Sequence, residues 1–333
     1  MLRALAKPEP GFTAHQSKKL LNLMSDPRGN LFNAISIEGG YVRPFDGFIF
    51  LCGGLVDATS PSPTSVRDAI FRELAKNRDL EPRVRLAEEY KDWSFDGHYK
   101  DLLTFEEHIA QLSAVIVLVL ESPGSLAELG LFTALEAFRK KLMVFISNHH
   151  YEQTSFIRLG PVKYLEESDN RAACFPWIKL NLGRESLDLE RVNELQLELF
   201  EAVKERLPLP NTDTLFDKQL WLHRALLVCE LLWLMSALTI TELVSYLEIC
   251  GVNLTQSELR QTLFILEKMG LIAIEARSTQ RFYVSKIDRS FIKWNYLVDV
   301  FDAARFQSEV AKYYENDDKK RFRALQQSRG VRV

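Results

Sequence analysis

The stretch Val115–Phe132, VIVLVLESPGSLAELGLF, decides the fold of the first half of this 333-residue chain. Residues Val115 to Leu120 are apolar and mostly β-branched, which predicts a buried central strand. The turn Ser122-Pro123-Gly124-Ser125 then leads into a helix that carries Glu128. We therefore expect a carboxylate about one turn inside a helix at the carboxyl edge of a sheet, where ligands bind in open α/β folds.

Glu128 has two interpretations. Ser125 and Glu128 have the spacing of a capping box, in which the glutamate accepts a hydrogen bond from a backbone N–H at the helix start. On spacing alone the cap is the commoner case. In the other interpretation, Glu128 is the reactive group at the sheet edge. A cap tolerates glutamine and a nucleophile does not, so the two interpretations differ in what they predict for Glu128→Gln.

Composition sets the class of protein. The length suggests about two domains, and 47% hydrophobic with 26% charged residues is ordinary for a folded globular chain. No apolar run approaches the ~20 residues that span a bilayer, and the N-terminal sequence lacks a secretory signal pattern. We therefore expect a cytoplasmic protein without a membrane partner. The net charge of −3 gives no overall attraction to nucleic acid.

The sequence shows no metal-ligand spacing and no bound-cofactor motif. Four cysteines occur without a CxxC or His-paired arrangement, namely Cys52, Cys174, Cys229 and Cys250. We therefore expect no zinc site and no disulfide framework. The pair His149-His150 follows a predicted strand in a polar turn and is most simply a surface loop.

Strands and helices alternate around the central stretch. A first strand, Phe48–Cys52, runs into Gly53-Gly54, where backbone can approach a ligand closely, although a tight strand exit without a ligand is equally compatible. The other predicted elements are a helix at 66–76, a strand at 84–87, a helix at 105–112, strands at 141–146 and 176–180, and a helix at 187–206. This rhythm predicts a doubly wound parallel sheet of the flavodoxin or Rossmann type. In the flavodoxin order, Gly53-Gly54 and Ser122 to Glu128 lie side by side.

The second half of the chain has a different pattern. After a Pro-rich linker at 207–213, helices are expected at 216–235, 240–249 and 256–269, followed by short strands at 271–275 and 281–284. Helix, turn, helix, hairpin is the order of a winged helix-turn-helix. Basic residues on or beside it are the candidates for phosphate contacts with nucleic acid: Arg260, Arg277, Arg281 and Lys286. Winged helices also serve as protein contacts, and that alternative stays open.

These patterns predict five segments. They are an N-terminal helical extension at 1–45 with a helix at 15–24, an α/β domain at 46–206, the linker at 207–213, a mostly α winged-helix domain at 214–315 that ends in a helix at 290–314, and a basic tail at 316–333.

Three motifs resemble a known family. They are Phe50-Leu51-Cys52-Gly53-Gly54, then Glu121-Ser122-Pro123-Gly124-Ser125 with Glu128-Leu129-Gly130, and later Ser155-Phe156-Ile157 with Gly160-Pro161-Val162. Together they are similar to the nucleoside 2-deoxyribosyltransferase-like effectors encoded beside retron reverse transcriptases. The likeness covers about residues 45–170, and the winged-helix layout agrees with it.

The resemblance implies a toxic N-glycosidase of an anti-phage system. Such effectors are held inactive by reverse transcriptase and multicopy single-stranded DNA (msDNA), and NAD hydrolysis is the activity to expect, with an oligomer or filament of the complex as a further expectation. Carried over to this sequence, Glu128 is the nucleophile, and Ser122, Gly124 and Ser125 match the substrate-holding turn beside Gly53 and Gly54. Glu88 and Glu106 are the nearest matches for further acidic groups.

A carboxylate suits this chemistry because N-glycoside cleavage passes through a cation-like sugar, which the carboxylate stabilises and then bonds. Nicotinamide leaves as a neutral base and needs no general acid. A purine needs protonation, for which Glu88, Glu106 or Glu121 requires a raised pKa. Two other functions remain open: a deoxyribosyltransferase or nucleotide hydrolase of metabolism, and a non-enzymatic nucleotide sensor that binds DNA.

Overall fold

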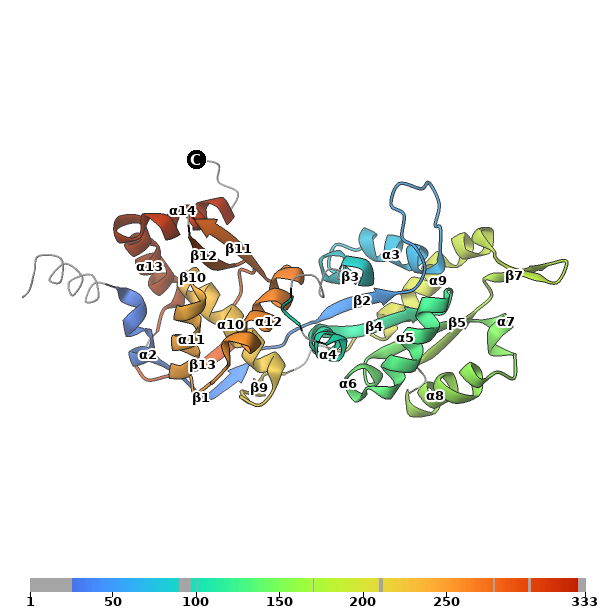
Figure 1. Cartoon of the computed structure of the whole chain (residues 1–333), viewed down its shortest axis with the longest axis horizontal. Coiled ribbons are helices and arrows are strands. Elements are labelled where there is room, and N and C mark those ends of the chain that lie inside the picture. The colour runs from blue at the N-terminus through green and yellow to red at the C-terminus, as the bar shows by residue number, and fades with distance from the viewer. Residues whose placement is uncertain are drawn as a thin grey trace, which may run out of the picture. The chain divides into compact units, whose positions relative to one another are not determined.

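The computed structural model describes residues 26–89, 97–99, 101–169, 171–209, 212–277, 279–298 and 301–328. The chain splits into two compact units (Figure 1). One is Pro44–Thr212, here called the α/β unit, and the other joins Met1–Arg43 with Asp213–Val333 and is called the helix-rich unit. The helix predicted at 15–24 lies outside the described residues.

The α/β unit is built on a parallel sheet. In the part of the chain that the structure describes, its five strands run in the order β3-β2-β4-β5-β6, with bounds Val84–Leu86, Phe48–Cys52, Ser113–Val119, Leu142–Ser147 and Ala172–Phe175. This is the flavodoxin-type order, in which the direction of winding reverses between β2 and β4. The predicted doubly wound sheet and the neighbourhood of its first and third strands are therefore confirmed.

Helices cover both faces of this sheet (Figure 1). Alternate residues of β2 point to opposite faces. Ile49 and Leu51 share a core with α3 (Val66–Lys76) and α9 (Leu189–Glu205). The other face lies against α4 (Leu102–Leu112), α5 (Pro123–Ala134) and α6 (Glu136–Arg139), and α7 (Asn148–Tyr151) and α8 (Lys163–Asp169) follow β5.

The fifth strand predicted at 176–180 is wrong. The fifth parallel strand is β6, and β7 (Ile178–Asn181) instead pairs antiparallel with β8 (Arg184–Leu187). Leu182 and Gly183 have φ of 50° and 76°, so the chain reverses in a two-residue hairpin turn before it can extend along the sheet. Trp177, just before β7, is fully buried in the core beside α9.

The helix-rich unit contains the predicted run of helices and a hairpin. These are α10 (Trp221–Met235), α11 (Ile240–Ile249), α12 (Gln256–Lys268), β11 (Ile272–Arg277) and β12 (Gln280–Ser285). A short strand that the sequence analysis missed, β10 (Ala237–Leu238), pairs with β12, so the sheet order is β10-β12-β11. No helix among the described residues combines the length and apolarity needed to cross a membrane.

A second small sheet corrects two further expectations. Residues 35–42, expected within a helical extension, form β1 (Ile35–Val42), which lies between β13 (Ile292–Tyr296) and β9 (Thr214–Leu215). The helix expected at 290–314 is therefore β13 followed by α13 (Ala303–Asp317). Buried Ile292 and Trp294 alternate with exposed residues, which is a strand period that the helix assignment overlooked.

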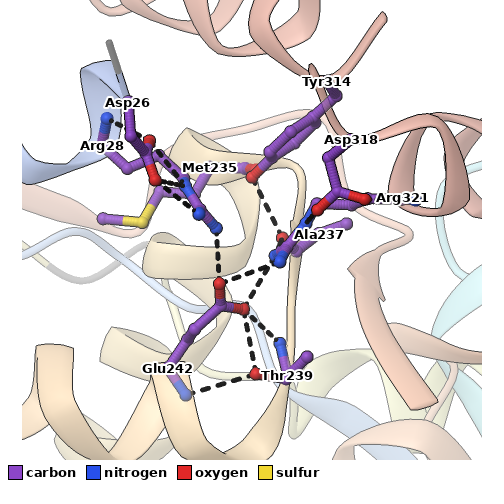
Figure 2. A network of polar contacts seen from close by, with 9 residues as sticks. All are labelled: Asp26, Arg28, Met235, Ala237, Thr239, Glu242, Tyr314, Asp318 and Arg321. Carbon is purple, nitrogen blue, oxygen red and sulfur yellow. Dashed lines mark hydrogen bonds and ion pairs between the residues drawn. The ribbon is translucent and has the colours of Figure 1, made fainter. Parts of the chain in front are cut away.

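The basic tail expected at 316–333 is also wrong in part. Residues 319–328 form helix α14 (Lys319–Ser328), which packs on the helix-rich unit. Its Arg321 is buried and bonds to Glu242 of α11 and to the carbonyl oxygen of Ala237 (Figure 2). The same carboxylate accepts a hydrogen bond at 2.8 Å from Arg28, near the start of the described chain. Glu242 thus joins three segments that are distant in sequence.

Candidate functional site

A cavity of about 510 Å³ opens at the carboxyl edge of the sheet, between the ends of β2 and β4. Cys52, Gly53 and Gly54 line it from the end of β2, and Ser122 and Glu128 line it from the segment after β4. An apolar wall of Phe50, Phe105, Ile109, Phe132 and Phe138 completes it. The cavity lies at the switch point of the sheet, where ligands bind in this fold class.

Glu128 faces this cavity and is not a helix cap. The N-cap of α5 is Ser122, whose hydroxyl accepts from the backbone N–H of Ser125, while the Ser125 hydroxyl completes the capping box. The Ser125–Glu128 cap considered from sequence is therefore wrong. Glu128 accepts no hydrogen bond from any residue that the structure describes. Burial raises its pKa, and the charge of Glu88 adds to this rise against the opposing charge of Arg67.

Glu106 enters the same cavity from α4. Its Oε2 atom is buried and has no hydrogen-bond partner among the described residues. Burial, with the negative charge of Glu128 added, raises the pKa of Glu106 to about 7. Two carboxyl groups on different helices therefore share one cavity, and the negative charge of Glu128 disfavours ionisation of Glu106.

Glu88 also lines the cavity but is bound to an arginine. Arg67 of α3 is buried and holds Glu88 with both terminal nitrogens, through Nη1 at 2.8 Å and through a second bond from Nη2. Arg67 Nη1 also lies 3.4 Å from the carbonyl oxygen of Leu51 at the end of β2. Arg67 was not among the residues predicted from the sequence. Its only signal there is that a basic residue occupies the first turn of a helix, where the helix dipole disfavours it.

Glu121 is a structural clamp at the switch point. Its carboxylate accepts hydrogen bonds from the backbone N–H groups of Gly54 (2.8 Å), Val66 (2.8 Å) and Arg67 (3.1 Å). Burial raises the pKa of Glu121, and these backbone donors oppose the rise. The carboxylate thereby occupies the N-terminus of α3 and ties it to the ends of β2 and β4.

The turn expected to hold substrate is only partly available. Ser122 lines the cavity, but Ser125 is buried in the capping box. Gly124 is exposed, and a Cβ built on it would meet only Ser122 Oγ, at 3.8 Å. By contrast, a Cβ on Gly54 would lie 2.8 Å from the Glu121 carboxyl group, so Gly54 is required by packing.

A second cavity of about 610 Å³ adjoins the first. Gly54, Leu55 and Ser122 line both cavities. Trp177, His150 and Glu185 line only the second. The two cavities therefore share part of their lining, and the switch point offers a two-part binding site.

The basic residues proposed for nucleic acid divide into two groups. Arg260 on α12, Arg281 on β12 and Lys286 just after it are exposed. Burial raises the pKa of Tyr283, and the charges of Arg281 and Arg260 both oppose this rise. The two arginines therefore lie near the same side chain. Arg277 instead donates to the carbonyl of Arg323 and to Gln327, so it anchors α14.

The fold and the cavity define the class: an α/β protein with an acidic ligand cavity at the switch point, joined in one chain to a helix-rich unit. Comparison with known families then places it. The model of the STM3845 retron effector protein family matches residues 63–274. The chain belongs to this family of retron effectors.

Two relatives from Escherichia coli agree with this placement. A protein named as a candidate ribosyltransferase/DNA-binding protein of retron Ec73 is 28% identical over 270 residues, which cover 76% of this chain and 81% of the relative. A protein named in the same way for retron Ec86 is 31% identical over 159 residues, covering 47% of this chain and 50% of that relative.

Proposed function

We propose that this retron effector is a toxic N-glycosidase that hydrolyses the N-glycosidic bond of NAD or a related nucleotide, with Glu128 as the nucleophile. The observation that carries the proposal is the convergence of Glu128 and Glu106 on one cavity at the switch point. A Glu128 carboxylate without a hydrogen-bonding residue among those described is available to react. The name ribosyltransferase given to both relatives supports chemistry at a ribosyl carbon.

In the proposed first step, a Glu128 oxygen bonds to C1′ of the ribose while the C1′–N bond breaks. The electron pair of that bond goes to the base, and a cationic nicotinamide leaves as a neutral molecule. Water then attacks C1′, loses a proton to the solvent and releases Glu128 as a carboxylate. The positive charge of Arg67 lowers the pKa of Glu128 and so favours its ionised, nucleophilic form, whereas the charge of Glu88 opposes this.

Two compartments favour a dinucleotide over a nucleoside. The first cavity holds the reactive carboxylates beside aromatic side chains, which suit the ribose and the leaving base. The second shares Gly54 and Ser122 with the first and has room for the other nucleoside half. A single nucleoside would leave it unoccupied.

The helix-rich unit is proposed to serve recognition. Its order of helix, strand, two helices and hairpin supports a winged helix-turn-helix, with exposed Arg260, Arg281 and Lys286 as phosphate contacts. Both relatives are named as DNA-binding. We infer that msDNA and the retron reverse transcriptase bind the effector and restrain it until phage infection, in an assembly that includes an oligomer or filament.

The test compares Glu128→Gln with Glu136→Gln, which removes an exposed carboxylate from the neighbouring helix α6. Glu128→Gln should abolish cellular toxicity and lower the release of nicotinamide from NAD by at least ~10³-fold, because the amide cannot form the glycosyl ester. Circular dichroism should show an unchanged fold. Glu136→Gln should behave as wild type. Nicotinamide release by folded Glu128→Gln at the wild-type rate would refute the proposal.

Transfer and sensing are separated by two further measurements. A transferase would exchange the base when a nucleoside is supplied with a second free base, whereas a hydrolase yields free sugar. A sensor would bind nucleotide tightly without turnover. One observation counts against the sensor. That hypothesis makes Glu128 a helix cap, but the cap of α5 is formed by Ser122 and Ser125.

A further inference from the structure

His149, His150 and Glu185 form a compact cluster at the edge of the second cavity. His149 Nε2 lies 2.9 Å from Glu185 Oε1, and His150 Nε2 lies 2.9 Å from Glu185 Oε2. One candidate ligand atom from each residue lies within 4.8 Å of the other two. His150 and Glu185 both line the cavity. From the sequence, these histidines were expected only in a surface loop.

The cluster depends on tertiary structure. His149 and His150 follow β5 on the short helix α7, held by a hydrogen bond from the His150 N–H to Ser147 Oγ. Glu185 arrives from the β7–β8 hairpin, 35 residues beyond His150. The tight turn at Leu182-Gly183 brings this carboxylate back to the histidines. No spacing within the linear sequence would reveal this set.

The atoms around His149 favour a cation. Its Nε2 lies 2.9 Å from Glu185 Oε1 and also 2.9 Å from the amide of Gln153. A single ring nitrogen cannot both donate to the carboxylate and accept from an amide N–H. Rotation of the amide by 180° places its oxygen there, so that two oxygens compete for one proton. A metal ion bound by His149 Nε2 and the Glu185 carboxylate would take the place of that proton.

We propose that His149, His150 and Glu185 bind a divalent transition-metal ion of the zinc class, with an open coordination position toward the second cavity. Two imidazoles and one carboxylate are a ligand set that zinc adopts in open sites, which keep a position for water or an exchangeable ligand. Each ligand side chain is partly exposed, so an ion can enter without unfolding.

The ion would also offset the negative charge of the second cavity. The described residues that line it include Glu185 and Glu121 but no lysine or arginine. Without a cation, Glu185 would repel any phosphate that entered. With the ion bound, the cavity presents a Lewis acid to an oxyanion. The proposed site does not depend on the glycosidase activity, since it can be tested by metal binding alone.

The experiment titrates the purified full-length chain with Co²⁺, a spectroscopic substitute for Zn²⁺. We expect visible absorption bands that saturate at a single equivalent, that disappear when Zn²⁺ is added, and that shift when inorganic phosphate occupies the open position. His149→Ala, His150→Ala and Glu185→Gln should each abolish the bands. The control Glu198→Gln removes an exposed carboxylate from α9 and should leave them unchanged.

Two results would overturn the site. One is the absence of a saturable band in the wild-type chain. The other is a band that persists in all three ligand variants, since that would place the ion elsewhere. The variants are surface substitutions in a unit whose core they do not touch, and thermal unfolding should confirm that they fold. Nicotinamide release measured on the same samples keeps this outcome separate from that of the glycosidase proposal.

Discussion

Glu106 and Glu128 lie in one cavity but are expected to hold protons differently. Glu106 has a pKa of about 7, raised by burial and by the charge of Glu128. Burial also raises the pKa of Glu128, and the positive charge of Arg67 opposes that rise. Such a division assigns the acid role to the group that retains its proton and the nucleophile role to the group that loses it.

This division predicts a dependence on the leaving base. With a purine deoxynucleotide, Glu106 must be protonated, so kcat/KM should fall about tenfold per pH unit above about 7. With the same substrate, Glu106→Gln should lower kcat/KM by about 10²–10⁴-fold. With NAD, whose base leaves without protonation, both effects should be small. Initial rates measured from pH 5 to 9 on both substrates check this. Equal pH profiles would remove Glu106 from the acid role.

Glu242 is the central residue of the buried network in the helix-rich unit (Figure 2). It accepts from Arg28 and Arg321, whose side chains are only 8% and 6% exposed. Glu242→Gln would leave two buried guanidinium groups without their shared charge. We expect a loss of about 3 kcal/mol in the free energy of unfolding, measured by urea denaturation. The control Glu248→Gln alters an exposed residue on the same helix and should have little effect.

The network also predicts how stability varies with pH. Burial alone would raise the pKa of Glu242, but the hydrogen bond and charge of Arg321, the charge of Arg28 and the Thr239 N–H lower it from 4.5 to about 2. Because the folded pKa is the lower one, the stabilisation is complete above about 4.5 and is lost as the pH falls toward 2. Glu242→Gln should flatten this part of the curve. An unchanged slope would contradict the assignment.

At the scale of elements, the ends of β2 and β4 are joined through Glu121 and Gly54. A Cβ on Gly54 would lie 2.8 Å from the Glu121 carboxyl group and 3.0 Å from Ser65 Cβ. Gly54→Ala should therefore displace the clamp, lower the free energy of unfolding by about 1–3 kcal/mol and weaken substrate binding. Thermal unfolding and KM measure the two effects.

Gly124→Ala is the matched control at the other lip of the cavity. The only atom near its Cβ would be Ser122 Oγ, at 3.8 Å. Alanine is a better helix former than glycine, so stability should stay equal or rise by up to about 1 kcal/mol. KM should not change. If Gly124→Ala weakens binding as much as Gly54→Ala, the Ser122–Ser125 turn contacts the substrate more closely than its geometry suggests.

Local patterns predicted the elements of the α/β unit well because parallel strands are continuous apolar runs between helices. Helix α3 follows from Ser65 and the apolar period after it, and β4 from VIVLVL. The role of Glu128 was ambiguous because Ser122 and Ser125 both fit the cap position. Only the observed hydrogen bonds select Ser122, which frees Glu128 for the cavity.

Long-range contacts account for the remaining errors. β1 pairs with β9 and β13 across most of the chain, so a local period such as that of Ile292 and Trp294 can indicate a strand but not its partner. The charged segment 319–328 looked like a tail, yet Arg321 is buried because Glu242 compensates its charge. Arg67 and the His149–His150–Glu185 cluster were missed for the same reason, since their partners are distant in sequence.

For the whole molecule, the α/β unit is an insertion into the helix-rich unit. The chain leaves that unit after β1 and returns at β9, and these strands pair antiparallel with Val42 opposite Thr214. Directly opposed residues lie about 5 Å apart, so a short loop can close the gap. Each unit also has its own core. The two units should therefore fold separately.

Separate folding of the two units predicts that enzymatic activity and nucleic-acid affinity can be obtained in two different fragments of the chain. A chain in which a four-residue Gly/Ser loop replaces residues 44–212 should unfold cooperatively in urea and should lose stability on Glu242→Gln by as much as the full chain. The shortened chain should bind single-stranded DNA with an affinity that falls steeply as the salt concentration rises. The double variant Arg260→Ala, Arg281→Ala should make this fall less steep, because about two fewer counterions are released on binding. The excised segment 44–212 should release nicotinamide without binding DNA. A shortened chain with no cooperative transition would show instead that the inserted unit is needed to hold β1 against β9.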